Sequence, residues 1–445
     1  MAGIRHRALV ATLSLIVSSG PLAGCASSRP EPAAAAPVSP AAASAPVSPT
    51  AAAVGVEAAR PADFPSWLAE FREEARRAGI SEATLRRTLA GLEPIPSVIA
   101  SDESQPEFVR PVWAYLDSAV SDARIARGRG LLAEHAPLFA AMEERYGVPA
   151  GIVAAIWGME SNFGGNVGNL PVIPALATLA HAGRRTAYGR EQLLAALRIV
   201  DGGDIEPERM IGSWAGAMGQ TQFIPTTYLR YAVDADSDGR RDLWSSLPDV
   251  FFSTARYLAE AGWRPGVPWG TEVVLPPGFD LSLTDLAVVR PTAQWQALGV
   301  RAAGGALPAG TEPASLLLPA GHSGPAFLVT GNYRAILRYN NSSSYALAVG
   351  HLADRLEGGG TIRAAWPRHL QPLARDERME LQRLLTERGY DTGVPDGIIG
   401  PMTRSALRRF QADQGIPADG FPTTGVLDRL RRAGTGSGGP VPAIL

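Results

Sequence analysis

The sequence has little cysteine and histidine, no excess of one charge and no long apolar run. Its 445 residues include a single cysteine, so a disulfide within the chain and a zinc site built on cysteines are both excluded. The six histidines are scattered, and none stands in the H-E-x-x-H pattern of zinc peptidases. With 41 basic against 43 acidic residues, charge gives no argument for nucleic acid as a partner. The length predicts two or three domains.

The N-terminus explains the lone cysteine. A short apolar run over residues 8–17 follows Arg5 and Arg7, and it is too short to span a bilayer. This pattern predicts a secretory signal peptide over residues 1–24. The run L-A-G-C ending at Cys25 resembles the lipobox of bacterial lipoproteins, whose cysteine is lipidated after cleavage. Ordinary cleavage near Ala23, with an incidental cysteine, is the alternative.

The residues around Cys25 also bear on location. Ala26 follows Cys25 where some lipoproteins carry aspartate, and the resemblance then implies the periplasmic face of the outer membrane. Residues 25–62 are rich in Ala, Pro and Ser, so they cannot bury a core and are expected to form a semi-extended tether.

The next three hundred residues show mostly helical spacing of apolar side chains. Short runs among Pro and Gly predict strands at residues 272–275, 315–318 and 325–330. The fold class is therefore mainly α (α+β), a helical body with a small β insertion. Helices are predicted over residues 63–92, 105–128, 130–146, 186–200, 251–261 and 345–356.

The central stretch, residues 148–163, reads V-P-A-G-I-V-A-A-I-W-G-M-E-S-N-F and carries one carboxylate, Glu160. Pro149 suits the first turn of a helix, and Gly164 is expected to end it. Glu160 would lie in the last turn among large apolar side chains. Desolvation penalises a charged carboxylate, so its pKa should rise, as a general acid requires. A buried glutamate paired with a backbone group or an arginine is the alternative.

A glycine-rich segment, residues 212–228, reads G-S-W-A-G-A-M-G-Q-T-Q-F-I-P-T-T-Y. Small residues let backbones approach closely, and the amides of Gln220 and Gln222 can pair with ligand amides or hydroxyls. A packing turn rich in glycine is the alternative.

Two other groups of polar side chains could also contact a ligand. Tyr339, Asn340 and Tyr345 follow a strand-like run, and aromatic rings beside amides suit sugars. Arg184 and Arg185 offer two adjacent cations. Ordinary surface positions are the alternative for both groups.

An acidic loop, residues 234–249, has the pattern of the first half of a calcium-binding EF-hand loop. Gly239 supplies the sharp turn, and Arg240 would contribute only its backbone carbonyl. The twelfth position is Ser245 instead of the usual glutamate, and Asp249 is the nearest substitute. A plain acidic turn is the alternative. The alternating carboxylates are those of Asp234, Asp236 and Asp238.

Together these segments resemble the B-type lytic murein transglycosylases over residues 63–356, with the motifs in the family's order. The resemblance implies a lysozyme-like core and cleavage of the MurNAc–GlcNAc β-1,4 bond of peptidoglycan. It implies Glu160 as the single acid/base, and the basic pair as a site for peptide or muramyl carboxylates. The acidic loop matches the family's structural Ca²⁺ site, although its distal acid stands one residue later. Residues matching the glycan groove are Ser213, Gln222, Tyr115, Tyr257, Tyr339, Asn340 and Tyr345.

The number of carboxylates bears on mechanism. Ordinary glycosidases use two, whereas these segments offer one in an apolar setting. The family's route needs one: Glu160 protonates the glycosidic oxygen, then takes the proton of the MurNAc C6 hydroxyl as a 1,6-anhydro ring closes. No cofactor is required for this chemistry.

The C-terminal region is separated by a linker over residues 365–374. Residues 375–434 contain D-G-I-I-G-P-M-T-R-S-A-L-R-R-F-Q and resemble the three-helix peptidoglycan-binding domain. Two Asp-Gly turns, at Asp396 and Asp419, form a weak internal echo. A helical cap on the catalytic body is the alternative. Residues 435–445 would be a tail, and residues 63–364 the catalytic domain.

Three functions follow for comparison. The leading one is a lytic transglycosylase anchored to the outer membrane, with peptidoglycan as substrate and proteins of cell-wall synthesis or division as further partners. A hydrolytic muramidase on the same core is the nearest rival. A non-catalytic lipoprotein that tethers the outer membrane to the wall is the third.

Overall fold

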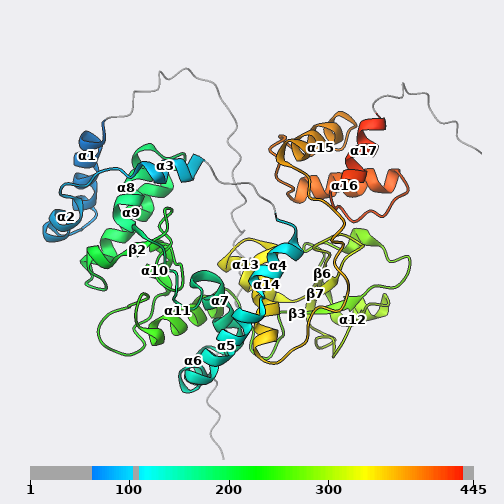
Figure 1. The fold of residues 1–445 in the computed structure, drawn as a ribbon, viewed down its shortest axis with the longest axis horizontal. Helices are drawn as coiled ribbons and strands as arrows, with labels where there is room; N and C mark the ends of the chain where they lie inside the picture. The colour runs from blue at the N-terminus through cyan, green and yellow to red at the C-terminus, as the bar shows by residue number, and fades with distance from the viewer. Residues whose placement is uncertain (1–62, 104–109, 434–445) are drawn as a thin grey trace, which may run out of the picture. The chain divides into compact units, whose positions relative to one another are not determined.

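The computed structural model describes residues 63–103 and 110–433 (Figure 1). The predicted signal peptide, Cys25 and the Ala/Pro-rich tether lie outside the described residues. Among the residues described, no helix combines the length and apolar character needed to cross a membrane.

The first helical core is assembled from segments far apart in the sequence, with α8 packed along α9. Phe71, Leu85 and Leu176 are fully buried in it, and each such burial stabilises the fold by about 1.5–3 kcal/mol. Asp63 and Ser81 cap the first two helices by accepting backbone N–H bonds. The helices are α1 (Phe64–Arg77), α2 (Glu82–Leu89), α3 (Pro96–Glu103), α8 (Val172–Ala182), α9 (Thr186–Asp201) and α10 (Pro225–Tyr231).

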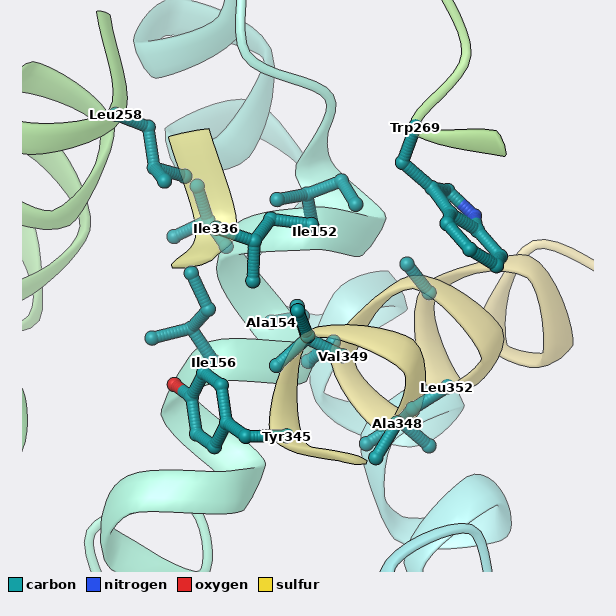
Figure 2. Packing of buried hydrophobic residues seen from close by; sticks show 14 of the residues in the cluster. Ile152, Ala154, Ile156, Leu258, Trp269, Ile336, Tyr345, Ala348, Val349 and Leu352 are labelled. Carbon is teal, nitrogen blue, oxygen red and sulfur yellow. The ribbon is translucent and has the colours of Figure 1, made fainter. Parts of the chain in front are cut away.

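The second helical core surrounds α7 (Ala150–Ser161), which is buried along nearly its whole length. Figure 2 shows Ile152 and Ile156 of α7 near Val349 and Tyr345 of α14. This burial explains the uniformly apolar sequence of α7. The other helices are α4 (Val112–Ala119), α5 (Asp122–Glu134), α6 (Ala136–Tyr146), α11 (Leu247–Glu260), α13 (Gly331–Tyr339) and α14 (Ser343–Leu356).

The β insertion holds an antiparallel sheet of five strands within the described residues, in the order β4-β6-β7-β3-β5. The strands predicted at residues 272–275, 315–318 and 325–330 are present as β3, β6 and β7, each with ends shifted by one or two residues. Helix α12 (Thr292–Ala297) packs its fully buried Trp295 against this sheet, and the indole donates to Ala314 O at 3.0 Å. The strands are β3 (Gly270–Val274), β4 (Arg290–Pro291), β5 (Arg301–Ala302), β6 (Pro313–Leu317) and β7 (Ala326–Val329).

The C-terminal domain consists of α15 (Arg375–Glu387), α16 (Pro401–Asp413) and α17 (Thr424–Ala433) around its own apolar core. The internal echo has a structural basis. Gln382 of α15 bonds the first Asp-Gly turn, donating to Asp396 Oδ1 at 3.0 Å and accepting from Gly397 N at 2.7 Å. Gln411 of α16 bonds the second turn in the same way.

The C-terminal domain contacts the β insertion through charged side chains. His322 Nδ1 lies 2.7 Å from Asp419 Oδ2, and Arg408 Nη1 donates to Asp285 Oδ2 at 2.7 Å. Arg408 also donates to Thr284 O at 2.9 Å. These contacts dock the domain on the β insertion.

Several predicted helix boundaries are wrong, each for a local reason. Residues 105–109 of the predicted helix 105–128 lie outside the described residues, and its described part is interrupted at Ser121, which caps α5. The predicted helix 130–146 is interrupted at His135, after which Pro137 lies in the first turn of α6. The helix predicted from residue 251 begins at Leu247, where Ser246 is the cap. The stretch after β7 forms the helix α13, where the sequence pattern predicted none.

Candidate active site

Glu160 lies in the last turn of α7, as predicted, but the helix ends at Ser161 and not at Gly164. The end is a left-handed turn in which Phe163 N bonds Trp157 O at 3.2 Å, a Schellman-type closure. Asn162 (φ 50°) and Phe163 (φ 57°) both adopt this conformation without being glycine. Such residues cost about 1–3 kcal/mol each and persist only where their surroundings hold them.

The environment of Glu160 raises its pKa to about 7, chiefly because the carboxyl is removed from water. The Tyr345 hydroxyl opposes this by donating to Glu160 Oε1 at 2.5 Å, and that bond lowers the pKa. A carboxyl with a pKa near 7 is poised both to give and to take a proton at neutral pH. The prediction of a raised pKa is confirmed.

Tyrosines predicted for the groove gather beside Glu160. Burial, and to a smaller extent the charge of Glu160, raises the pKa of Tyr115, Tyr339 and Tyr345. Tyr339 donates to Thr221 O at 2.7 Å, which fixes its ring. Tyr257 joins the group through its ring, which meets that of Tyr339 edge-on with centroids 4.9 Å apart.

Two aromatic residues of this group were missed from the sequence. The buried Phe223 ring lies 5.8 Å from the rings of both Tyr257 and Tyr339. Tyr231 lies 4.7 Å from Tyr257. Phe223 stands within the glycine-rich motif, so its position there was the available signal; Tyr231 had none.

The glycine-rich segment places Ser213 and Gln222 differently from Gln220. Ser213 closes a tight turn, with its hydroxyl accepting from Ala217 N at 3.0 Å. Gln222 (φ 52°) donates to Val167 O at 3.1 Å and remains partly exposed. Gln220 is buried and accepts a bond from the Trp157 indole at 2.7 Å, which joins this segment to α7.

Asn340 and the basic pair lie on the surface. Asn340 is exposed at the C-terminal end of α13. Arg184 and Arg185 both pair with Asp102, whose side chain is only 1% exposed, at 3.8 and 3.6 Å. Their charges therefore first balance a buried carboxylate. Arg185 also lies over the Trp214 ring.

The acidic loop brings Asp234, Asp236 and Asp249 together, with one carboxylate oxygen of each within 4.8 Å of the others. Asp249 is fully buried, and its pKa is raised to about 6, mainly by burial and further by the other two carboxylates. Asp238 is exposed, and its Oδ1 accepts from Arg240 N at 2.8 Å instead of joining the cluster. Hard oxygen donors of this kind fit a calcium ion.

Comparison with known proteins identifies the body of the chain. The family described as "Transglycosylase SLT domain" matches residues 63–354. The chain belongs to this family. After the transglycosylase domain, residues 374–430 match the family described as "Putative peptidoglycan binding domain". The resemblance to lytic murein transglycosylases and the lysozyme-like, mainly helical fold class are thereby confirmed.

Individual proteins similar to this SLT-domain chain include lytic transglycosylases. The crystal structure of SltB3 from Pseudomonas aeruginosa in complex with NAG-anhNAM-pentapeptide is 55% identical, with a TM-score of 0.81 over 83% of this chain and 99% of that chain. Membrane-bound lytic murein transglycosylase B of Escherichia coli (strain K12) is 36% identical over 47% of this chain. That match spans 57% of the relative's length. Escherichia coli Slt35 in complex with calcium is 26% identical, with a TM-score of 0.57, over 65% of this chain and 92% of that chain.

Proposed function

We propose that this protein is a lytic transglycosylase that cleaves the MurNAc–GlcNAc bond of peptidoglycan and leaves 1,6-anhydroMurNAc ends. The observation that carries the proposal is a single carboxyl, Glu160, with a pKa of about 7 among tyrosines. Membership of the SLT family supports it, as does the anhydro-muramyl ligand, NAG-anhNAM-pentapeptide, in the complex of the relative SltB3.

Glu160 would act twice. In its protonated form it gives its proton to the glycosidic oxygen, and the C1–O bond breaks as the GlcNAc hydroxyl leaves. The carboxylate then takes the proton of the C6 hydroxyl while the C6 oxygen bonds to C1. Glu160 ends protonated, and no water is consumed. One group can serve both steps because its pKa lies near neutrality.

The surroundings of Glu160 support a one-carboxylate route over hydrolysis. A glycosidase of the ordinary kind places a second carboxylate about 5–9.5 Å from the acid. Among the described residues, burial and the Tyr345 hydrogen bond account for the shifted pKa of Glu160, and no second carboxylate is needed to explain it. A hydrolytic muramidase is the second candidate function, because a water molecule held by polar side chains could attack in place of the C6 hydroxyl. A pure wall tether has no need of a poised acid.

The acidic loop would hold a structural calcium ion. The ligands would be the carboxylates of Asp234, Asp236 and Asp249. The buried Asp249 and the two less buried aspartates repel one another without a cation, so the cluster fits a calcium ion. The loop pattern predicts Asp238 and the Arg240 carbonyl as further donors, but Asp238 accepts from Arg240 N outside the carboxylate cluster, so the other three aspartates would be the main ligands. The ion would stabilise the loop and take no part in the chemistry, for which no cofactor is required. The relative Slt35, solved in complex with calcium, supports this choice of ion.

The protein would work at the periplasmic face of the outer membrane, held by a lipid on Cys25. Each buried CH₂ of an acyl chain contributes about 0.8 kcal/mol of membrane affinity. The C-terminal domain would bind peptidoglycan, and Arg184 and Arg185 would face its carboxylates. Ser213, Gln222, Asn340 and the tyrosines would line the glycan groove. Proteins of cell-wall synthesis or division are further partners.

Product analysis tests this function. Digestion of purified peptidoglycan by the protein should release muropeptides that end in 1,6-anhydroMurNAc. Reducing MurNAc ends would identify a hydrolase, and no release at all would favour the tether.

A further inference from the structure

We propose that Gln220 is a positioning residue for Glu160, because its buried amide ties the last turn of α7 to the glycine-rich segment. The inference rests on the proposed catalytic role of Glu160. It adds a residue that acts through the helix end rather than on the substrate.

Both ends of the Gln220 side chain are engaged. Oε1 accepts from the Trp157 indole at 2.7 Å, and Nε2 donates to Trp244 O at 2.9 Å. Trp157 lies one turn before Glu160 on α7. Gln220 is only 8% exposed, so losing these bonds would leave buried polar groups without hydrogen-bond partners. The amide is thus used inside the protein, not offered to a ligand.

The same amide lies against the strained turn that follows Glu160. Asn162, Phe163 and Gly164 are three consecutive residues with positive φ, at 50°, 57° and 76°. A Cβ atom at Gly164 would clash with Oε1 of Gln220, so the amide fills the space beside this turn. A strained backbone persists only where packing holds it, and Gln220 is one of the groups that hold it.

The segment around Trp244, which accepts the bond from Gln220 Nε2, is also held by hydrogen bonds. Trp244 N donates to Asp242 Oδ1 at 2.8 Å, and Asp242 N donates to the buried Asp249 Oδ2 at 2.7 Å. Gln220 N also donates to Leu243 O at 2.7 Å. Gln220 therefore connects the end of α7 to residues 242–244, whose backbone is itself fixed by hydrogen bonds.

Gln220→Leu is the direct test, with Gln192→Leu as its matched control. Gln192 is also buried, at 2% exposed, and its Oε1 accepts from Thr226 N and Oγ1 at 3.0 Å each. It lies on α9 in the first helical core, so its loss costs stability without touching α7. We expect Gln220→Leu to lower kcat by about 10–100-fold with little change in KM, because small misplacements of a catalytic group are costly. Gln192→Leu should keep the parent kcat.

A second readout needs no substrate. Carbon-13 NMR of the Glu160 carboxyl in the free protein should show its pKa falling from about 7 toward the usual range in Gln220→Leu, because a looser turn admits water. Gly164→Ala, which displaces the same amide, should shift it the same way; Gln192→Leu should not. An unchanged titration and kcat in folded Gln220→Leu and Gly164→Ala proteins would overturn the proposal. Reducing products from the parent would overturn only the proposed function, since the titration stands apart from it.

Discussion

The Tyr345 hydroxyl donates to Glu160 Oε1 at 2.5 Å, from the first turn of α14 to the last turn of α7. Burial and this bond act on the carboxyl in opposite directions, and burial prevails, leaving a pKa of about 7. In the proposed mechanism, this balance would let one side chain serve as both acid and base. Tyr345 and Glu160 can each be substituted separately to test this balance.

Tyr345→Phe should raise the pKa of Glu160, because the lost bond stabilised the carboxylate. A hydrogen bond to a charged group is worth about 1.5–3 kcal/mol, which corresponds to about one to two pKa units. If the free enzyme needs protonated Glu160, as proposed, kcat/KM should fall as pH rises through this pKa. In Tyr345→Phe that fall should move to higher pH. The pH profile of kcat/KM measures it. Tyr333→Phe, which removes a bond to Ser343 O, should leave the fall in place.

Calcium should raise the melting temperature of the parent protein, because a ligand that binds only the folded state stabilises it. At a free concentration one hundred times Kd the gain is about 2.7 kcal/mol. Asp236→Ala should abolish the rise, whereas Asp238→Ala, outside the carboxylate cluster, should keep most of it. Identical melts of the parent with calcium and with a chelator would reduce the loop to a plain turn.

Removing residues 373–445 should weaken pelleting with purified sacculi while cleavage of small soluble glycans is retained. The C-terminal domain has its own apolar core, so its loss opens no hole in the helical cores. It does remove the Arg408–Asp285 and His322–Asp419 contacts, and a modest loss of thermal stability is expected. Removing only residues 434–445 is the control. Equal pelleting of both truncated forms would favour a structural cap.

Cys25→Ser should move the protein from the membrane pellet to the soluble periplasmic fraction, because the acyl anchor can no longer form. Cell fractionation followed by immunoblotting measures this. Ala23→Gly, which leaves the cysteine in place, is the control and should stay with the membranes. Sedimentation of the Cys25→Ser protein with membranes would contradict lipidation.

The site could be predicted in part because its chemistry is local. The apolar neighbours of Glu160 in α7 already indicate desolvation, and the raised pKa follows. The strands of the β insertion and the Asp-Gly turns also follow from short-range patterns. The roles of long-range partners do not. Nothing in the residues near Arg184 shows that a buried Asp102, some eighty positions earlier, takes up its charge.

Two further features could not be predicted from the sequence, because tertiary contacts determine them. The helix end was expected at Gly164, yet Asn162 and Phe163 already adopt the left-handed conformation that glycine favours. The sequence pattern indicated a ligand contact for Gln220, and only packing shows that both ends of its amide are engaged by tryptophans. In both cases the surroundings override the local preference.

The most direct test of the central claim is mass spectrometry of muropeptides released from peptidoglycan in H₂¹⁸O. If Glu160 drives attack by the C6 hydroxyl, the products end in 1,6-anhydroMurNAc and carry no ¹⁸O at the cleaved end. Glu160→Gln should fold but lose at least about 10²–10⁴-fold in rate, because the amide cannot exchange the proton. Reducing, ¹⁸O-labelled MurNAc ends from the parent, or full activity in Glu160→Gln, would contradict the account.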